Sequence, residues 1–428
     1  MSAGNGHGGT PQVPAAAAPP GPVRVGRRTL LRLAGAAGAA LALPQLAAAC
    51  GSSDGGGSAS GGASDELKVG LLLELSAVYA VNGQDMRSGF ELYLSEHGGQ
   101  LGGRKVNLTV EDIAGDPAVG VQKATKLLRQ ERVAVASGIV TSSVALAVRD
   151  MFDTSKVPLI ISNAGANSLT RDRKSRYLFR TSFSNWQPNY SMGQWVYDNV
   201  AKDGVYAVAP DYVAGHEQTD AFKEAYTKAG GKLAGEVHPP FATTQDYQPF
   251  LSQIRKANPK AVYAFFSGGE AVTFVKQYAE FGLKDSVPLV GPGFTVEGVL
   301  EAQGDAALGV RSGLHYTILL DNPTNQRFVA AYRQKFSKDP TVFSVQSYDA
   351  AQLIDLALKK TNGDTANQEA VAEALASVGE IDSPRGRFRL DATTHNPVQP
   401  FYLREVRKVG DRLGNVKIGD LGELADPG

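Results

Sequence analysis

The sequence has 428 residues, and its 43 basic side chains are balanced by 43 acidic ones, so the formal net charge at pH 7 is +0. A chain without a basic excess does not neutralise phosphates well, so we expect no nucleic-acid partner. Cys50 is the only cysteine, which excludes an internal disulfide and a metal site built from cysteines.

The first fifty residues have the order of a secretory signal. Arginines come first, an apolar run of alanine, leucine and glycine follows at 33–49, and no acidic residue precedes Asp54. A basic region, an apolar region and small residues before a cleavage point are the parts of a signal that is removed from the mature protein. We predict residues 1–50 as this signal. A permanent membrane helix is the weaker alternative, because the run is rich in alanine and contains Pro44.

Two short motifs refine this prediction. The segment 27–32, Arg-Arg-Thr-Leu-Leu-Arg, resembles a twin-arginine export signal, with the Sec route as the alternative. Three alanines before Cys50 resemble a bacterial lipobox, although the leucine stands at Leu46, one position early. We therefore predict lipidation of Cys50, with a free cysteine as the alternative, and a location on the outer face of the cell membrane or in the periplasm. Residues 51–65, rich in glycine and serine, are predicted to be a flexible linker.

Beyond residue 65, apolar segments of strand character alternate with segments of helical spacing. Strands are predicted at 67–75, 104–112, 133–137, 158–162 and 179–181, and helices at 83–96, 117–130 and 144–153. Nearly continuous apolar strands joined by helices are typical of a parallel sheet covered on both faces. These elements predict one α/β lobe.

The same rhythm starts again near Trp186. Strands are predicted at 205–209, 233–238, 261–266 and 288–291, and helices at 187–200, 217–229, 247–257 and 270–281. Later helices at 325–335, 344–360 and 367–377 and strands at 387–390 and 401–406 are too few for a third domain. We predict that they complete two lobes: residues 66–185 with about 318–385, and residues 186–317 with about 386–428. Ligands of such sheets bind at the carboxyl ends of the strands, so we expect a cleft there.

A series of short motifs follows these elements in order. They are Ser76-Ala77-Val78-Tyr79 with Gly83, the segment 98–103, Asp112 with Asp116-Pro117, Gly138 with Thr141-Ser142-Ser143, the segment 158–166, Arg180-Thr181, Asp211-Tyr212 with Gly215, Gly291-Pro292, and Tyr348-Asp349-Ala350. Behind a lipoprotein-type signal, this series resembles the leucine/isoleucine/valine-binding branch of the type I periplasmic binding proteins, from about residue 67 to about 406.

The resemblance implies the type I periplasmic-binding-protein fold, in which two parallel-sheet α/β lobes close about a hinged cleft on a small-molecule solute. The closed form is presented to an ABC permease in the membrane. A solute shifts this equilibrium only as far as it binds the closed state better. We also expect a monomer without a cofactor.

Ser142 and Ser143 are the first candidate binding residues. They follow a predicted strand and begin a helix, where hydroxyls and free N–H groups suit a carboxylate. An ordinary helix cap is the alternative, and the resemblance implies that serine here meets the carboxylate of the solute. Ala164 and Ala166 match the next ligand loop, where only their backbone groups are available.

In the second lobe, Ser267 and Gly293 stand where the resemblance implies a tyrosine and an acidic residue. The acidic residue would pair with the ammonium group of an amino acid, because a buried charge without a partner is costly. Gly293 has no side chain to do this, so Glu270 or Asp211 could replace it, with a solvated helix start as the alternative for Glu270. Six further polar or aromatic residues stand at predicted cleft turns: Tyr79, Asn82, Asn185, Trp186, Tyr212 and Phe294.

These residues predict a substrate-binding lipoprotein of an ABC importer. The expected solute is a branched-chain or related amino acid. Retained carboxylate capture with weakened ammonium capture makes an aromatic or other organic acid the alternative, and a ligand-sensing receptor is a further one. We expect no enzyme: the six histidines lack metal-ligand spacing, and the glycines at 4, 6 and 9 have no strand before them. No P-loop or nucleophile elbow occurs.

Overall fold

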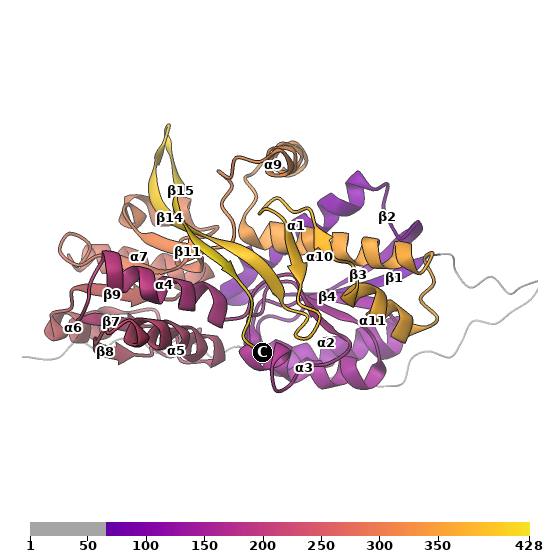
Figure 1. Cartoon of the computed structure of the whole chain (residues 1–428), viewed down its shortest axis with the longest axis horizontal. Coiled ribbons are helices and arrows are strands. Elements are labelled where there is room, and N and C mark those ends of the chain that lie inside the picture. Colours follow the sequence, from indigo (N-terminus) through magenta and orange to yellow (C-terminus); the bar gives the residue numbers. More distant parts are fainter. Residues whose placement is uncertain (1–65) are drawn as a thin grey trace, which may run out of the picture. The chain divides into compact units, whose positions relative to one another are not determined.

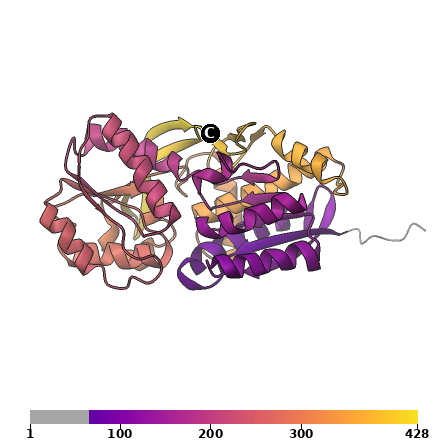
Figure 2. The same cartoon turned by 90° about the horizontal axis from the view of Figure 1, so that it is seen from below.

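The structure is a computed structural model that describes residues 66–428. The predicted signal, the linker and the lipidation at Cys50 lie outside the described residues. Within 66–428, none of the helices has the length and apolar character that a membrane crossing requires. The described chain forms two sheets, each flanked by its own helices (Figures 1 and 2).

The first sheet has the strand order β2-β3-β1-β4-β5-β6. Every pairing is parallel except β2 with β3. All residues of the central strand β1 except Lys68 are buried, which confirms a sheet covered on both faces. The elements are β1 Leu67–Leu73, α1 Ala80–Glu96, β2 Gln100–Leu101, β3 Arg104–Asp112, α2 Pro117–Thr125 with a π-helical turn at Lys126–Glu131, β4 Val135–Gly138, α3 Ser142–Ser155, β5 Leu159–Ile161 and β6 Leu178–Arg180.

The second sheet has the order β12-β13-β14-β11-β10-β9-β7-β8, with β15 paired to β14. Strands β7 to β10 are parallel, as predicted. Strand β11, which was not predicted, is parallel to β10, but β12 to β15 pair antiparallel. The elements are α4 Trp186–Asn199, β7 Val205–Val208, α5 Val213–Lys228, β8 Leu233–Val237, α6 Gln248–Ala257, β9 Ala261–Ala264, α7 Gly268–Glu280, β10 Leu289–Pro292, α8 Leu300–Gln303, β11 Arg311–Leu314, β12 Glu380–Ile381, β13 Phe388–Leu390, β14 Pro397–Val409 and β15 Arg412–Leu424.

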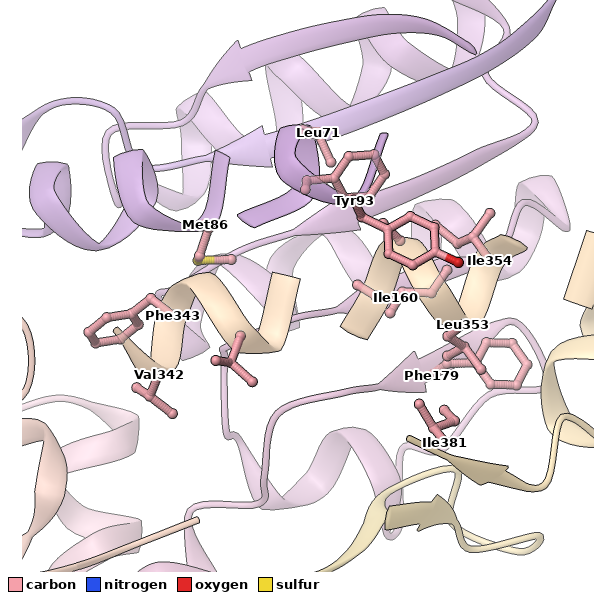
Figure 3. Close-up of a cluster of buried hydrophobic side chains, with 14 of the residues drawn as sticks. Leu71, Met86, Tyr93, Ile160, Phe179, Val342, Phe343, Leu353, Ile354 and Ile381 are labelled. Atoms are coloured by element: carbon pink, nitrogen blue, oxygen red, sulfur yellow. The ribbon is translucent and has the colours of Figure 1, made fainter. Parts of the chain in front are cut away.

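Three late helices, α9 (Pro323–Phe336), α10 (Val342–Lys360) and α11 (Gln368–Ala376), stand between β11 and β12 in the chain. Helix α10 packs against α1 of the first sheet, and Tyr93 Oη donates a 2.7 Å hydrogen bond to Asp355 there. Figure 3 shows Val342, Phe343, Leu353 and Ile354 of α10 in one apolar cluster with residues from α1 and the sheet. The core of the first sheet therefore depends on a segment far away in the sequence. The residues at which each lobe begins and ends stay a prediction.

The chain crosses from one sheet and its helices to the other after β6, after β11 and after α11, and we call these crossing segments the first, second and third passages. A fully buried ion pair lies where these passages meet: Arg385 and Asp349 are 2.9 Å apart, and both side chains are 0% exposed. Arg385 also donates to the carbonyl oxygens of Thr181 and Ser182. A guanidinium has enough donors to bind all these acceptors at once, so it fastens the first and third passages together.

Candidate functional site

A cavity lies where strands of both sheets end. It is lined by Tyr79, Val140, Ser142, Asn163, Gly165, Phe183, Asn185, Tyr212, Ala214, Gln218, Phe265, Ser267 and Phe294. The space enclosed in this conformation is about 20 Å³, which suffices for about one water molecule. A larger guest therefore requires the surrounding elements to move apart or side chains to turn.

Six of the predicted binding residues lie on the cavity wall: Tyr79, Ser142, Asn185, Tyr212, Ser267 and Phe294. Asn82 lies directly behind the wall, where its Nδ2 donates to Ser267 Oγ at 3.1 Å. The structure thus brings together side chains from turns that are widely separated in the chain. Their contact with a solute stays a prediction.

The structure does not bring the other five predicted residues to the wall. Ser143 is the next residue along α3 and is half-buried. One backbone group of each alanine is already used, since Ala164 N–H donates to the carbonyl oxygen of Ile139 and the carbonyl oxygen of Ala166 accepts from Arg180. Trp186 instead donates to Glu224 and stacks on Tyr190. Glu270, the fifth, is buried beside the wall.

The start of α3 contributes a polar group to the wall. Ser142 is its first residue and is 2% exposed. The carboxylate of Glu74 accepts from the N–H groups of Val140 and Thr141, at 2.9 and 2.8 Å, so the loop before the helix is held and the N–H groups from Ser142 onward point along the helix axis. A hydroxyl beside the positive end of a helix dipole suits a carboxylate.

Five aromatic side chains lie on the wall: Tyr79, Phe183, Tyr212, Phe265 and Phe294. The rings of Phe183 and Phe294 are 4.7 Å apart, and Phe265 meets Phe294 edge-on at 6.4 Å. The hydroxyls of Tyr79 and Tyr212 are 3.0 Å apart and join the first sheet's turn to the second's. None of the lining residues carries a charge, and such a wall suits a flat apolar guest.

Neither proposed partner for an ammonium group lies on the wall. Asp211 is 60% exposed and pairs with His216. Glu270 is buried, and its Oε1 accepts from Ala242 N–H at 2.8 Å. Gly293 leaves no room for an acidic side chain, because a Cβ there would lie 2.0 Å from Arg404 Nη2. The cavity therefore offers an ammonium group no ionised partner in this conformation.

Burial raises the pKa of Glu270 from 4.5 to about 7. Since the folded-state pKa lies above the unfolded-state value, protonation of Glu270 stabilises the fold, and this contribution is lost as the pH rises from about 4.5 through 7. Glu270→Gln keeps the acceptor for Ala242 without a charge. We expect this variant to exceed the parent protein in free energy of unfolding by about 2 kcal/mol at pH 8 and by little at pH 5.

Urea unfolding at both pH values measures this difference. Glu280→Gln, at the exposed end of the same helix, is the control and should show no pH-dependent gain. An equal gain in free energy of unfolding for Glu270→Gln at both pH values would contradict the raised pKa of Glu270.

Several wall residues were not predicted from the sequence: Val140, Asn163, Gly165, Phe183 and Phe265, together with Gln218. Most of them stand one to four residues after a strand, so the rule that ligands bind at strand ends could have found them. Gln218 lies within α5 and gives no such signal. Nor did the sequence indicate Glu217, which accepts from Asn167 N–H and from Asn185 Nδ2 at 2.7 Å.

Within residues 66–428, no three His, Cys, Asp or Glu side chains are grouped so that they could hold a metal ion. The polar groups at the cavity are hydroxyls, amides and backbone groups. Such groups bind a guest by hydrogen bonds.

Known proteins resemble this chain in sequence and in structure. A family model described as "Periplasmic binding protein" matches residues 66–411. The Leu/Ile/Val-binding protein homolog 6 of Brucella melitensis is 33% identical over 379 residues, which cover 86% of this chain and 95% of the relative.

Two solved structures are also similar. A solute-binding protein of an ABC transporter from R. palustris, in complex with benzoate, is 38% identical with a TM-score of 0.80, over 85% of this chain and 98% of that one. A second, from Rhodopseudomonas palustris BisB5 in complex with 3,4-dihydroxybenzoic acid, is 33% identical with a TM-score of 0.79, over 85% and 99%.

Proposed function

This chain belongs to the periplasmic binding protein family, as a solute-binding protein of ABC transporters, and we propose that its solute is a small aromatic carboxylate of the benzoate type. Members of the family bind small-molecule solutes and work with ABC permeases. The family implies an exported protein. Anchoring through a lipid on Cys50 and a monomeric state are parts of this proposal.

The observation that carries the proposal is the uncharged, ring-lined wall with a helix start in it. Ser142 and the first turn of α3 offer hydrogen-bond donors to a carboxylate. The rings of Phe183, Phe265 and Phe294 offer apolar faces to a flat body. An amino acid would also bury an ammonium group, and without an ionised partner this costs several kcal/mol. Two similar solute-binding proteins hold benzoate or a dihydroxybenzoate, which supports the same class here.

A branched-chain amino acid is the second candidate. It is favoured by the Leu/Ile/Val-binding relatives and by Glu270, whose Oε2 is buried without a partner among the described residues. For an amino acid to bind, Glu270 would have to turn towards the cavity. The ligand-sensing receptor without transport also stays a prediction.

A binding series on the exported protein, purified as the cell processes it, tests the proposal. Benzoate, 4-hydroxybenzoate and 3,4-dihydroxybenzoate are compared with leucine, isoleucine and valine by thermal unfolding and calorimetry. A ligand present at about 100 times its Kd stabilises the folded state by about 2.7 kcal/mol. We expect this stabilisation from at least one aromatic acid and not from the amino acids. Binding of leucine, isoleucine or valine alone would overturn the aromatic assignment.

A further inference from the structure

A chain of three buried side chains connects the cavity wall to the passage after β11. Asn163, on the wall, lies with its Nδ2 2.7 Å from Gln346 Oε1. Gln346 Nε2 lies 3.0 Å from His315 Nε2. Gln346 and His315 are 0% exposed and Asn163 is 5% exposed. The amide of Asn163 makes no other hydrogen bond within residues 66–428, so its second polar atom is left for the cavity.

The neutral ring of His315 carries one proton on one of its two nitrogens. Burial, and then the positive charges of Arg385 and Arg404, lower the pKa of His315 well below its usual value, so the ring is neutral. Its Nδ1 is buried without a hydrogen-bond partner among the described residues, and the rings of Phe183 and Phe401 lie beside it. A neutral imidazole carries its proton either on Nδ1 or on Nε2.

The position of that proton sets the direction of donation along the chain. The oxygen and nitrogen of an amide are similar in size, so each amide can turn by 180° about its last bond within the same space. If Nδ1 is protonated, Gln346 donates to Nε2 and the oxygen of Asn163 faces the cavity. If Nε2 is protonated, His315 donates to Gln346, Gln346 donates to Asn163, and the NH₂ group of Asn163 faces the cavity.

The atoms as placed in the structure correspond to the first direction. The surroundings of His315 favour the second, in which both amides are turned by 180°. A proton on Nδ1 would be a buried donor without an acceptor, and leaving a buried donor unpaired is unfavourable. That proton would also lie in the field of Arg385 and Arg404, both buried cations. A lone pair on Nδ1 is stabilised by the same two charges.

We propose that His315 carries its proton on Nε2 and, through Gln346, orients the amide of Asn163 so that its NH₂ group faces the cavity and donates to the carboxylate of the solute. Gln346 and His315 are then positioning residues, and Asn163 is a carboxylate-binding residue beside Ser142. The inference rests on the proposed function in one respect, that the solute carries a carboxylate.

The tautomer is tested directly on the exported protein labelled with ¹⁵N-histidine. Proton-correlated ¹⁵N spectra show which ring nitrogen carries the proton, and comparison with His315→Gln identifies the signals of His315. We expect a proton on Nε2 and none on Nδ1. A proton on Nδ1 would overturn the proposal. This measurement does not depend on whether any solute binds.

A double-mutant cycle tests whether Gln346 acts through Asn163. Gln346→Met removes the donor to Asn163 without adding a charge, and we expect the Kd for benzoate to rise about three- to tenfold. In an Asn163→Ala background the same change should alter the Kd less than about twofold. Gln352→Met, on the same helix and outside the cavity lining, is the matched control. Equal effects of Gln346→Met in both backgrounds would overturn the positioning role.

The two proposals fail in different ways. If the protein binds leucine and no aromatic acid, the proposed solute is wrong, and the same cycle is run with leucine, which also carries a carboxylate. If benzoate binds but the cycle shows no coupling, the solute stands and the positioning role is wrong.

Discussion

Replacing Arg385 by methionine is expected to lower the free energy of unfolding by about 3–5 kcal/mol. Arg385 and Asp349 are both fully buried and 2.9 Å apart, so the variant leaves a buried carboxylate without its cation. Burial raises the pKa of Asp349 to about 6 even with Arg385 present. The variant also leaves the carbonyl oxygens of Thr181 and Ser182 without this donor. The first and third passages then lose the hydrogen bonds that hold them together.

Urea unfolding followed by circular dichroism measures this loss at pH 7. Arg387→Met is the matched control, because Arg387 pairs with Glu380 in an ion pair whose side chains are 72% and 60% exposed. Exposed pairs contribute about 0–1 kcal/mol. If the free energy of unfolding falls by the same small amount in both variants, the buried ion pair does not hold the passages together.

Replacing Ser142 by aspartate is expected to weaken benzoate binding at least about 100-fold. The change places a fixed negative charge where we propose that the carboxylate binds, and two like charges in a buried site repel strongly. An acidic residue in the first turn of a helix is itself favourable, so the variant should still fold. Loss of binding with a retained cooperative unfolding transition is the expected result.

Ser143→Asp adds the same charge to the same turn, one residue further along α3. Ser143 is half-buried and is not part of the cavity wall, so its Kd for benzoate should stay within about threefold of the parent value. Calorimetric titration compares the two variants. Equal losses would show that charge near α3, not contact with Ser142, controls binding.

The alternating strands and helices of both lobes could be predicted because each segment carries its own pattern. Strand β1 is apolar except for Lys68 and α1 has apolar residues at helical spacing, and both are present in the structure. Strand β15 was missed, since its Arg412–Leu424 sequence is rich in glycine and charge and most of its residues are not buried. It is held by pairing with β14, and that partner is not visible in a local pattern.

The residues in and behind the cavity wall also include some that the sequence could predict and some that it could not. Ser142, Tyr79 and Tyr212 were found because each follows a strand, and ligands bind at strand ends. Asn163 and Phe183 follow the same rule and were overlooked. Gln346 and His315 could not have been found, because each reaches Asn163 only through packing of α10 against the first sheet and the passage after β11.

The sequence by itself determined the α/β lobes, the resemblance to a family of solute-binding proteins and the serine at the start of α3, because periodicity, turn residues and short motifs are local properties. The tertiary structure alone decided which rings surround the cavity, that Glu270 and Asp211 stay off its wall, and that a buried chain from His315 ends at Asn163. These features depend on distances between segments far apart in the sequence, and such distances are set by how the two sheets and α10 pack.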